Sequence, residues 1–241
     1  MLRRQAIEKD HRDWDAYLRR TIICRLSRSL KPGTLLDVGC GGDGLARKVR
    51  RYVVGVDLEF EIATVPNFSA VKASGLRLPF PDHQFPIVVC SDVIEHLALP
   101  SRIHIIEELL RVTSDVLIVS FPSGTSAKEQ DTNIKNSLLV RGSDIPSWLD
   151  EHLRQQYPTP EGVLEIVQQI DSRVSTNVYS NFNLTLRKYY YRLVTAGSKP
   201  HWRALRLFSS NIVRILPRLC SLGECYRSVV VVRRNNTSER Q

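Results

Sequence analysis

The sequence predicts an α/β protein in which helices wrap a mainly parallel sheet. Its first half alternates short apolar segments with segments of helical periodicity, which is the pattern of successive βαβ units. One apolar segment leads directly into the glycine-rich stretch 39–44. A strand that turns sharply toward a helix beside a ligand needs glycines of this kind, because the backbone must bend and approach the ligand closely.

The elements can be assigned in order along the chain. Residues 1–31 are expected to form an N-terminal helical segment, 123–160 a loop or lid, and 184–223 a helical insert before the last strand. Apolar segments predict strands at 34–40, 52–58, 68–74, 86–93, 115–122, 175–184 and 225–234. Further helices are expected at 45–51, 100–113 and 159–170.

Size and composition favour one cytoplasmic domain. The chain has 241 residues, of which 42% are hydrophobic, enough for one sizeable core over residues 1–241. The N-terminus alternates charged and apolar residues, and no segment reaches the roughly 20 apolar residues that span a bilayer. Five scattered cysteines without a Cys-x-x-Cys pair are expected to be buried thiols.

The glycine-rich stretch fits two nucleoside cofactors. Gly39-x-Gly41-x-x-Gly44 matches the dinucleotide fingerprint, whereas Asp37-x-Gly39-x-Gly41 matches a loop that binds S-adenosylmethionine. Asp57, at the end of the second predicted strand, stands where nucleotide folds carry the acid that binds a ribose. Because both cofactors contain an adenosine ribose, Asp57 supports a nucleoside without separating them.

Asp37 separates the two cofactors. A carboxylate two residues before the first glycine would add negative charge beside a pyrophosphate, which is unfavourable. S-adenosylmethionine instead carries a sulfonium and an ammonium group, which a carboxylate can help to hold. The chain also lacks the Tyr-x-x-x-Lys pair of a short-chain dehydrogenase. The residues therefore predict S-adenosylmethionine as the cofactor.

Four segments of the chain, taken in order, resemble one family. They are "LLDVGCGGDGLA", "VVGVDL", "LPFPDHQFPIVVCSDVIEHL" and "LLRVTSDVLIVSFPSG". In order and spacing they resemble the small-molecule branch of the class I S-adenosylmethionine-dependent methyltransferases, including the ubiquinone-type O-methyltransferases. The resemblance implies a Rossmann-like, doubly wound sheet of seven strands with the last strand antiparallel. It also implies an enzyme that methylates a hydroxyl or another nucleophile of a small or lipid-like acceptor.

The resemblance assigns cofactor-binding roles to individual residues. Asp37, Gly39 and Gly41 would cradle the methionine part of the cofactor. Asp57 would bind the ribose hydroxyls, and Leu58 would pack on the adenine. The other expected cofactor contacts are Cys40, Ser74, Gly75, Leu76 and Ser91.

Three positions depart from the family's pattern. Asp43 stands in place of the third glycine, Ser74 in place of the acid that binds the adenine amino group, and Pro86 in place of an aspartate. A neutral serine hydrogen bond contributes about 0.5–1.5 kcal/mol, which predicts weaker cofactor binding. Asp43 is expected to cap the following helix instead. These departures leave a non-catalytic, methyltransferase-like binding protein as an alternative.

His96 is the candidate catalytic base. It follows the fourth predicted strand at the rim of the expected pocket, and an imidazole can accept a proton near neutral pH. Glu95 would orient it. The alternative is that His96 bonds the neighbouring loop and shapes the pocket wall.

A metal-binding interpretation of the same region must be weighed. Asp92, Glu95, His96 and His152 resemble the metal-binding set of the small-RNA 2′-O-methyltransferases, and such donors can bind magnesium, manganese or zinc. Glu-His after the fourth strand is, however, common in the family without a metal, and His152 could pack within the lid. The sequence therefore does not assign a metal site.

The chain's partners are predicted from its charge. The net charge is +9, with clusters of cations in 1–31 and 187–218, so an anionic partner and an ordinary solvated basic surface are both possible. Residues 202–219 predict an amphipathic helix with three arginines on its polar face. This helix would cover the acceptor pocket or make peripheral contact with a membrane. An RNA methyltransferase remains the alternative to a small-molecule one.

Overall fold

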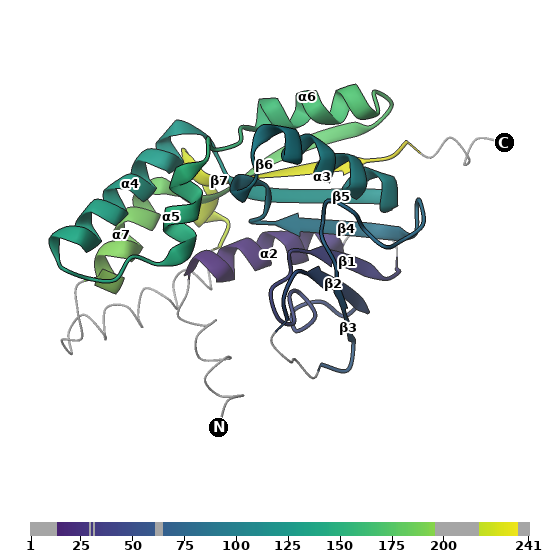
Figure 1. Cartoon of the computed structure of the whole chain (residues 1–241), viewed down its shortest axis with the longest axis horizontal. Helices are drawn as coiled ribbons and strands as arrows, with labels where there is room; N and C mark the ends of the chain where they lie inside the picture. Colours follow the sequence, from purple (N-terminus) through teal and green to yellow (C-terminus); the bar gives the residue numbers. More distant parts are fainter. Residues whose placement is uncertain (1–13, 29, 31, 61–64, 196–216, 236–241) are drawn as a thin grey trace.

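The computed structural model describes residues 14–28, 30, 32–60, 65–195 and 217–235, and it confirms the α/β class (Figure 1). A seven-stranded sheet has the order β3-β2-β1-β4-β5-β7-β6. β7 is antiparallel to both β5 and β6, while the pairs among β1 to β5 are parallel. The sheet therefore has the predicted doubly wound arrangement, with the last strand reversed.

Every predicted strand is present, with small shifts at its ends. The strands are β1 Leu35–Val38, β2 Val53–Asp57, β3 Phe68–Lys72, β4 Phe85–Ser91, β5 Thr113–Pro122, β6 Ser175–Asn183 and β7 Cys225–Arg233. Pro86 lies in β4, where the pairing with β5 shifts between Phe85 and Ile87. A proline lacks the N–H that a central strand would donate, so this irregularity is expected at its position.

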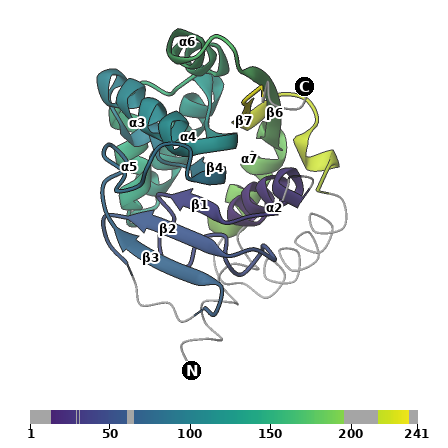
Figure 2. The same ribbon diagram turned by 90° about the vertical axis from the view of Figure 1, so that its right-hand side faces the viewer.

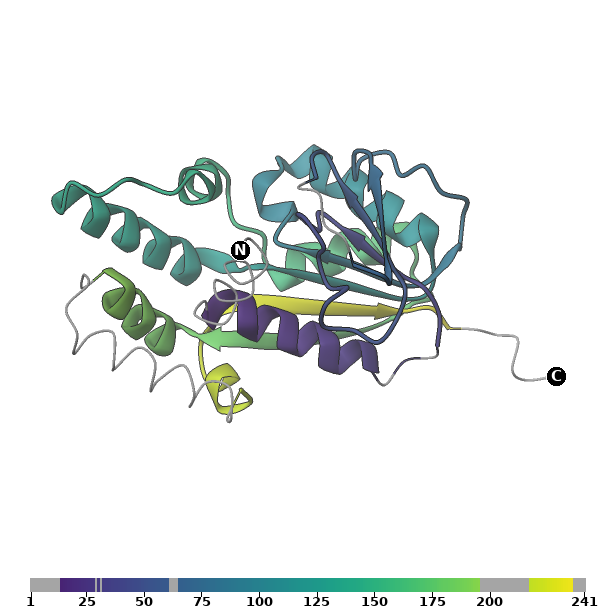
Figure 3. The ribbon, with the colours of Figure 1, turned by 90° about the horizontal axis from the view of Figure 1, so that it is seen from below.

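Helices cover both faces of the sheet, and further helices lie beyond one end of its strands. They are α2 Trp14–Arg28, α3 Leu99–Val112, α4 Gly124–Val140, α5 Ser147–Arg154, α6 Pro160–Ile170 and α7 Leu184–Thr195, with the short 3₁₀ helices η1 Ile94–His96 and η2 Leu219–Ser221. α3 and α6 lie on one face of the sheet and α2 on the other (Figure 2). α4, α5 and α7 lie beyond the ends of the strands (Figure 3).

Two apolar layers hold these helices on the sheet. On one face, Leu36 and Val38 of β1 belong to the buried cluster that includes residues of α3 and α6. On the other face, Leu35 packs in a cluster with Ile22 and Ile23 of α2. Burying side chains of this size contributes about 1.5–3 kcal/mol each. Both faces of β1 therefore pack against apolar side chains, as is usual for a central parallel strand.

The helix predicted at 45–51 is wrong. This segment forms turns, in which Ala46 N–H donates to Asp43 O and Lys48 N–H donates to Leu45 O. Four of its seven residues are cations, and the chain must enter β2 at Val53. Because the first turn of a helix is costly to form, a segment so short and so highly charged does not extend one.

The loop predicted at 123–160 is also wrong, because α4 and α5 lie within it. The buried residues of α4 are Ala127, Asp131 and Ile134, which follow helical spacing. Its central member is an aspartate. The apolar periodicity that would reveal the helix is therefore interrupted at a fully buried position.

Several expectations fall partly outside the described residues. α2 supports a helical N-terminal segment, but residues 1–13 are not described. The amphipathic helix predicted at 202–219 lies almost entirely in the undescribed range 196–216. All five cysteines are free thiols, and Cys24, Cys90 and Cys220 are buried as expected, whereas Cys40 and Cys225 are only partly buried. Among the described helices, none has the length and apolar character needed to cross a bilayer.

Candidate functional site

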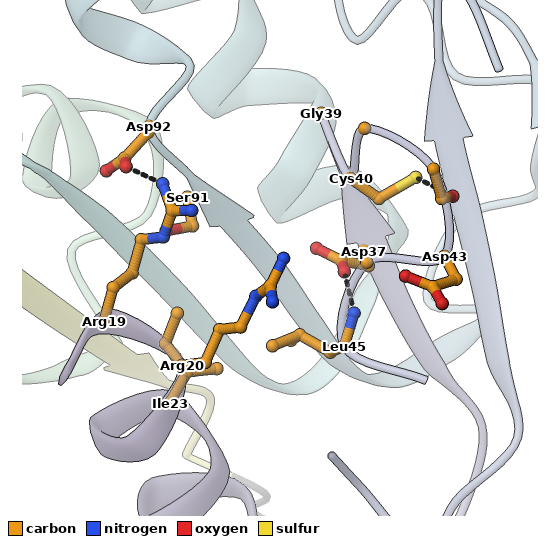
Figure 4. Close-up of a pocket in the computed structure, with 13 residues that line it drawn as sticks. Arg19, Arg20, Ile23, Asp37, Gly39, Cys40, Asp43, Leu45, Ser91 and Asp92 are labelled. Carbon is orange, nitrogen blue, oxygen red and sulfur yellow. Dashed lines mark hydrogen bonds and ion pairs between the residues drawn. The ribbon is translucent and has the colours of Figure 1, made fainter. Parts of the chain in front are cut away.

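A cavity of about 410 Å³ lies at the carboxyl ends of β1 and β4 (Figure 4). Residues 39–45 of the glycine-rich stretch and Asp37 form one wall, and Ser91 and Asp92 lie at the end of β4. α2 closes the other side with Arg19, Arg20 and Ile23. The carboxyl edge of a parallel sheet is the usual ligand position in this architecture.

The glycines are required by close approach of the backbone to its neighbours. Gly39 and Gly44 have φ angles of 72° and 50°, a region that favours glycine. A Cβ on Gly39 would overlap the side chain of Val93, and a Cβ on Gly44 would overlap the carboxylate of Asp37. The turn therefore needs a glycine at position 44, one residue after the place of the family's third glycine.

Asp37 fixes the turn that follows the glycines. Its Oδ2 accepts a hydrogen bond of 2.9 Å from the N–H of Leu45, and its side chain is buried. Burial raises the pKa of Asp37 to about 6, although the Leu45 N–H and the charges of Arg20 and Arg19 oppose the increase. Figure 4 shows the side chains of Arg20 and Asp37 extending toward one another across the cavity.

Asp43 does not cap a helix, contrary to expectation. Its carboxylate forms an ion pair with Arg47 four residues later, and no helix follows. Asp37 instead provides the carboxylate that accepts an N–H of this turn. The N–H of Leu45 therefore donates to a residue of β1 and not to the neighbouring Asp43.

Asp57 is joined to the cavity by the backbone of the glycine loop. Its Oδ2 accepts a 2.7 Å hydrogen bond from the N–H of Gly41, and its Oδ1 accepts one of 2.7 Å from Leu58. Leu58 itself is exposed at the end of β2. The N–H of Ala73 donates to Asp57 O at 3.1 Å, so the segment that begins at Ser74 lies beside this acid.

The predicted cofactor residues divide into two groups. Asp37, Gly39, Cys40, Gly41 and Ser91 line the cavity. The others are Asp57, Leu58, Ser74, Gly75 and Leu76, which lie beyond its lining at the ends of β2 and β3. Sequence reasoning missed Arg19 and Arg20, because nothing in the basic N-terminal segment distinguishes the cations that face the cavity.

A second cavity, of about 380 Å³, adjoins the first. The two share Arg19 and Asp92. His96 and His152 line the second cavity, together with the ring side chains Trp148, Tyr190, Tyr191 and Tyr226. These residues come from η1, α5, α7 and β7, so the helices beyond the strand ends form most of this wall.

Asp92 is held between two arginines. Arg19 forms an ion pair with it, and Arg227 donates from Nε to Oδ1 at 3.0 Å and from Nη2 to Oδ2 at 2.9 Å. Burial by itself would raise the pKa of Asp92, but the two guanidinium groups outweigh burial and hold the pKa at about 2. Asp92 therefore faces arginines and does not join the metal-binding set considered from the sequence.

Glu95, His96 and His152 do come together. One potential ligand atom from each lies within 4.8 Å of the others. His152 Nε2 is 3.7 Å from Glu95 Oε1, and the His96 and His152 rings meet edge to face with centroids 4.6 Å apart. Glu95 is fully buried, and neither carboxylate oxygen has a hydrogen-bond partner within the described part of the chain. One carboxylate and two imidazoles could hold a divalent cation here.

His96 has the protonation state that a general base requires. Burial and the neighbouring His152 lower its pKa from the ordinary value, so the imidazole is neutral near pH 7. Its Nδ1 lies 3.2 Å from Glu151 Oε2, which makes Glu151 the adjacent carboxylate. Glu95 has no hydrogen bond to His96, so the expectation that Glu95 orients this ring is wrong.

A glycine-lined cavity lies at the carboxyl ends of β1 and β4, where doubly wound proteins bind their ligands, and a second cavity with a neutral histidine adjoins it. Residues 36–116 match the family model of the methyltransferase domain. In this segment and in fold the chain is similar to the class I S-adenosylmethionine-dependent methyltransferases, and S-adenosylmethionine is the cofactor of that class.

Individual relatives support this class at a distance. The ubiquinone biosynthesis O-methyltransferase of Citrobacter koseri is 31% identical over 100 residues, which cover 36% of this chain and 41% of that protein. The match therefore spans less than two thirds of that relative's length.

Solved structures share the fold across more of the chain. Magnesium protoporphyrin IX methyltransferase from Synechocystis PCC 6803, solved with bound SAH, has 14% identity and a TM-score of 0.52, and the match covers 93% of this chain and 83% of that one. The small RNA methyltransferase HEN1 has 17% identity and a TM-score of 0.56, with coverage of 92% and 25%.

Proposed function

We propose that this chain transfers the methyl group of S-adenosylmethionine to a nucleophile, most simply a hydroxyl, on a small or lipid-like acceptor. The observation that carries the proposal is the junction of the two cavities at Arg19 and Asp92. Methyl transfer requires the acceptor atom, the methyl carbon and the sulfur to be aligned, so the two ligands must meet at one place. The acceptor would enter through the cavity beside His96.

In this proposal the first cavity holds the methionine part of the cofactor. Asp37 would attract the ammonium and sulfonium charges, and Arg20, on the opposite wall, would attract the carboxylate. Asp57 would accept hydrogen bonds from the ribose hydroxyls, since a carboxylate that already accepts backbone N–H groups retains further lone pairs. Leu58 and the 74–76 segment would contact the adenine.

The proposal is tested by ligand binding followed by transfer. Calorimetry should show binding of S-adenosylmethionine and of its demethylated product, and none of NAD. Incubation with methyl-labelled cofactor and a panel of hydroxyl compounds, with and without a hydrocarbon tail, should then label an acceptor. Binding of NAD without binding of S-adenosylmethionine contradicts the proposal. Cofactor binding without transfer to any member of a broad panel would favour the non-catalytic alternative.

Replacing Asp57 with alanine should weaken cofactor binding by roughly 1.5–3 kcal/mol, because the change removes a charged acceptor from the ribose hydroxyls. Calorimetric dissociation constants for S-adenosylmethionine measure the effect. Asp144→Ala, which removes an exposed acid from the loop before α5, is the matched control and should bind as the wild type does. Equal affinity of the two variants would remove Asp57 from the binding site.

Cofactor affinity should fall as the pH decreases through about 6. The pKa of Asp37 is raised to about 6, so its carboxylate is ionised above this pH and becomes neutral below it. Only the ionised form attracts the cationic cofactor, so the dissociation constant should rise by up to about tenfold per pH unit below 6. The Asp37→Asn variant should lose this dependence. An unchanged pH profile in that variant would assign the effect to another group.

A divalent cation would support a second candidate function, transfer to a ribose hydroxyl of RNA. The observation in its favour is the cluster of Glu95, His96 and His152, in which a fully buried carboxylate faces two imidazoles. A bound cation would lower the pKa of an acceptor hydroxyl beside it. Binding of RNA that weakens steeply with salt would favour this function, since phosphate contacts release counterions.

A further inference from the structure

A third cavity, of about 850 Å³, lies near the amino ends of β1 and β2. The proposed methyl-transfer site lies at the opposite, carboxyl ends of the strands. It is lined by the end of α2, the segment that leads into β1, and residues 48–52, which lead into β2. α2 runs along the sheet, so that its first turns lie near the carboxyl ends of the strands and its last turn lies near their amino ends (Figure 3). The cavity is therefore separate from the cofactor site.

Positive charge dominates this cavity. Arg28, Lys48, Arg50 and Arg51 line it, and no carboxylate is present among its described lining residues. Arg51 donates from Nη2 to the backbone carbonyls of Ser27 and Leu30, both at 2.8 Å. These contacts hold Arg51 in the cavity wall.

Arg28 and Arg50 are available to a ligand. Both are exposed, and neither makes a hydrogen bond or ion pair with another residue in the described ranges. Arg28 lies in the last turn of α2, where a cation also stabilises the helix dipole. That explanation does not apply to Arg50, because residues 45–51 form turns and not a helix. The turns bring Arg50 and Lys48 into the same cavity as Arg28.

We propose that this cavity binds an oligophosphate group, meaning two or more linked phosphates, either free or carried by a nucleotide. Several guanidinium groups around one space suit phosphate oxygens, which accept paired hydrogen bonds from each arginine. Arg28 and Arg50 together carry two positive charges, which two linked phosphates can compensate better than a ligand with one negative charge. The volume lies within the usual range of small-ligand cavities, about 300–1,000 Å³.

Tyr52 allows the two sources of phosphate to be distinguished. Its side chain lines the cavity and is 47% exposed, and its hydroxyl is 2.5 Å from Ser69 Oγ. The ring is therefore anchored at one end and offers a face on which a nucleotide base can stack. A nucleoside diphosphate should use this ring, whereas free pyrophosphate should not.

The test is calorimetric titration of the full-length protein with inorganic pyrophosphate at fixed ionic strength. The wild type should bind with saturation, and the double variant Arg28→Gln/Arg50→Gln should bind at least about tenfold more weakly. The matched control, Arg25→Gln/Arg77→Gln, removes two exposed arginines outside the cavity and should bind as the wild type does. Equal weakening in both double variants would indicate diffuse attraction to the net charge and overturn the proposal.

Two further arms complete the experiment. Adenosine diphosphate in place of pyrophosphate should show the same loss in Arg28→Gln/Arg50→Gln, and additional weakening in Tyr52→Leu would identify the nucleotide as the source. Saturating S-adenosylhomocysteine should leave pyrophosphate binding unchanged, since the two cavities lie at opposite ends of the strands. Competition between the two, or the absence of saturable pyrophosphate binding, overturns the proposal. None of these results depends on methyl transfer.

Discussion

Replacing His96 with alanine should lower the turnover of methyl transfer to a hydroxyl by roughly 100-fold or more, with cofactor affinity nearly unchanged. His96 lines the second cavity and not the first, and its lowered pKa keeps the imidazole able to accept the acceptor's proton. Steady-state rates with labelled S-adenosylmethionine, together with calorimetric cofactor affinity, measure the two quantities separately.

His104→Ala is the matched control, because this histidine is exposed on α3 and lies outside both cavities. It should retain wild-type turnover. Equal turnover in His96→Ala and the wild type would return His96 to a role in shaping the pocket wall. If chelation abolishes wild-type activity and magnesium or manganese restores it, the cluster of Glu95, His96 and His152 becomes the better account of catalysis.

The Arg187→Met variant should lower the free energy of unfolding by about 3–5 kcal/mol, since the change leaves a buried carboxylate without its cationic partner. Arg187 is fully buried, and its Nη2 donates to Asp131 Oδ1 at 2.6 Å. Its guanidinium also lies 3.4 Å from the ring centroid of Tyr226 and 4.7 Å from that of Tyr191. Urea unfolding followed by circular dichroism gives the change in stability.

Lys188→Met is the control for this prediction, because it removes the adjacent cation from the exposed face of α7. Its free energy of unfolding should stay within about 0.5 kcal/mol of the wild type. The double variant Asp131→Leu/Arg187→Met, which removes both charges, should recover part of the loss. A change of less than about 1 kcal/mol in Arg187→Met would mean that Asp131 is protonated or finds another partner.

The sheet could be predicted from the sequence because its information is local. Each strand is a short apolar segment, and Asp37 at the end of β1 is followed by Gly39 and Gly41 at the spacing of a ligand-binding turn. α4 was missed because Asp131 interrupts its apolar stripe. The prediction of a helix at 45–51 is wrong because it follows from local helix propensity alone. The segment is highly charged, and one residue separates it from β2, which begins at Val53.

The contacts that complete the site could not be predicted, because they join residues far apart in the chain. Asp92 meets Arg227 across 135 positions, and Asp131 meets Arg187 across 56. A single sequence gives no sign that these charges pair. Arg187 in particular begins the cationic cluster 187–218 of the sequence, whereas its side chain lies in the interior.

The carboxylate of Asp131 holds together several elements around the second cavity. The hydroxyls of Tyr157 and Tyr226 donate to its Oδ2 at 2.5 and 2.8 Å, and Arg187 donates to its Oδ1, so α4, α7, β7 and the segment before α6 are joined at one polar point. The helices beyond the strand ends are thus attached by specific bonds as well as by apolar contacts. Side chains that line the second cavity, such as Trp148, can then change over evolution without detaching those helices. New acceptors could be accommodated while the cofactor half of the molecule stays the same.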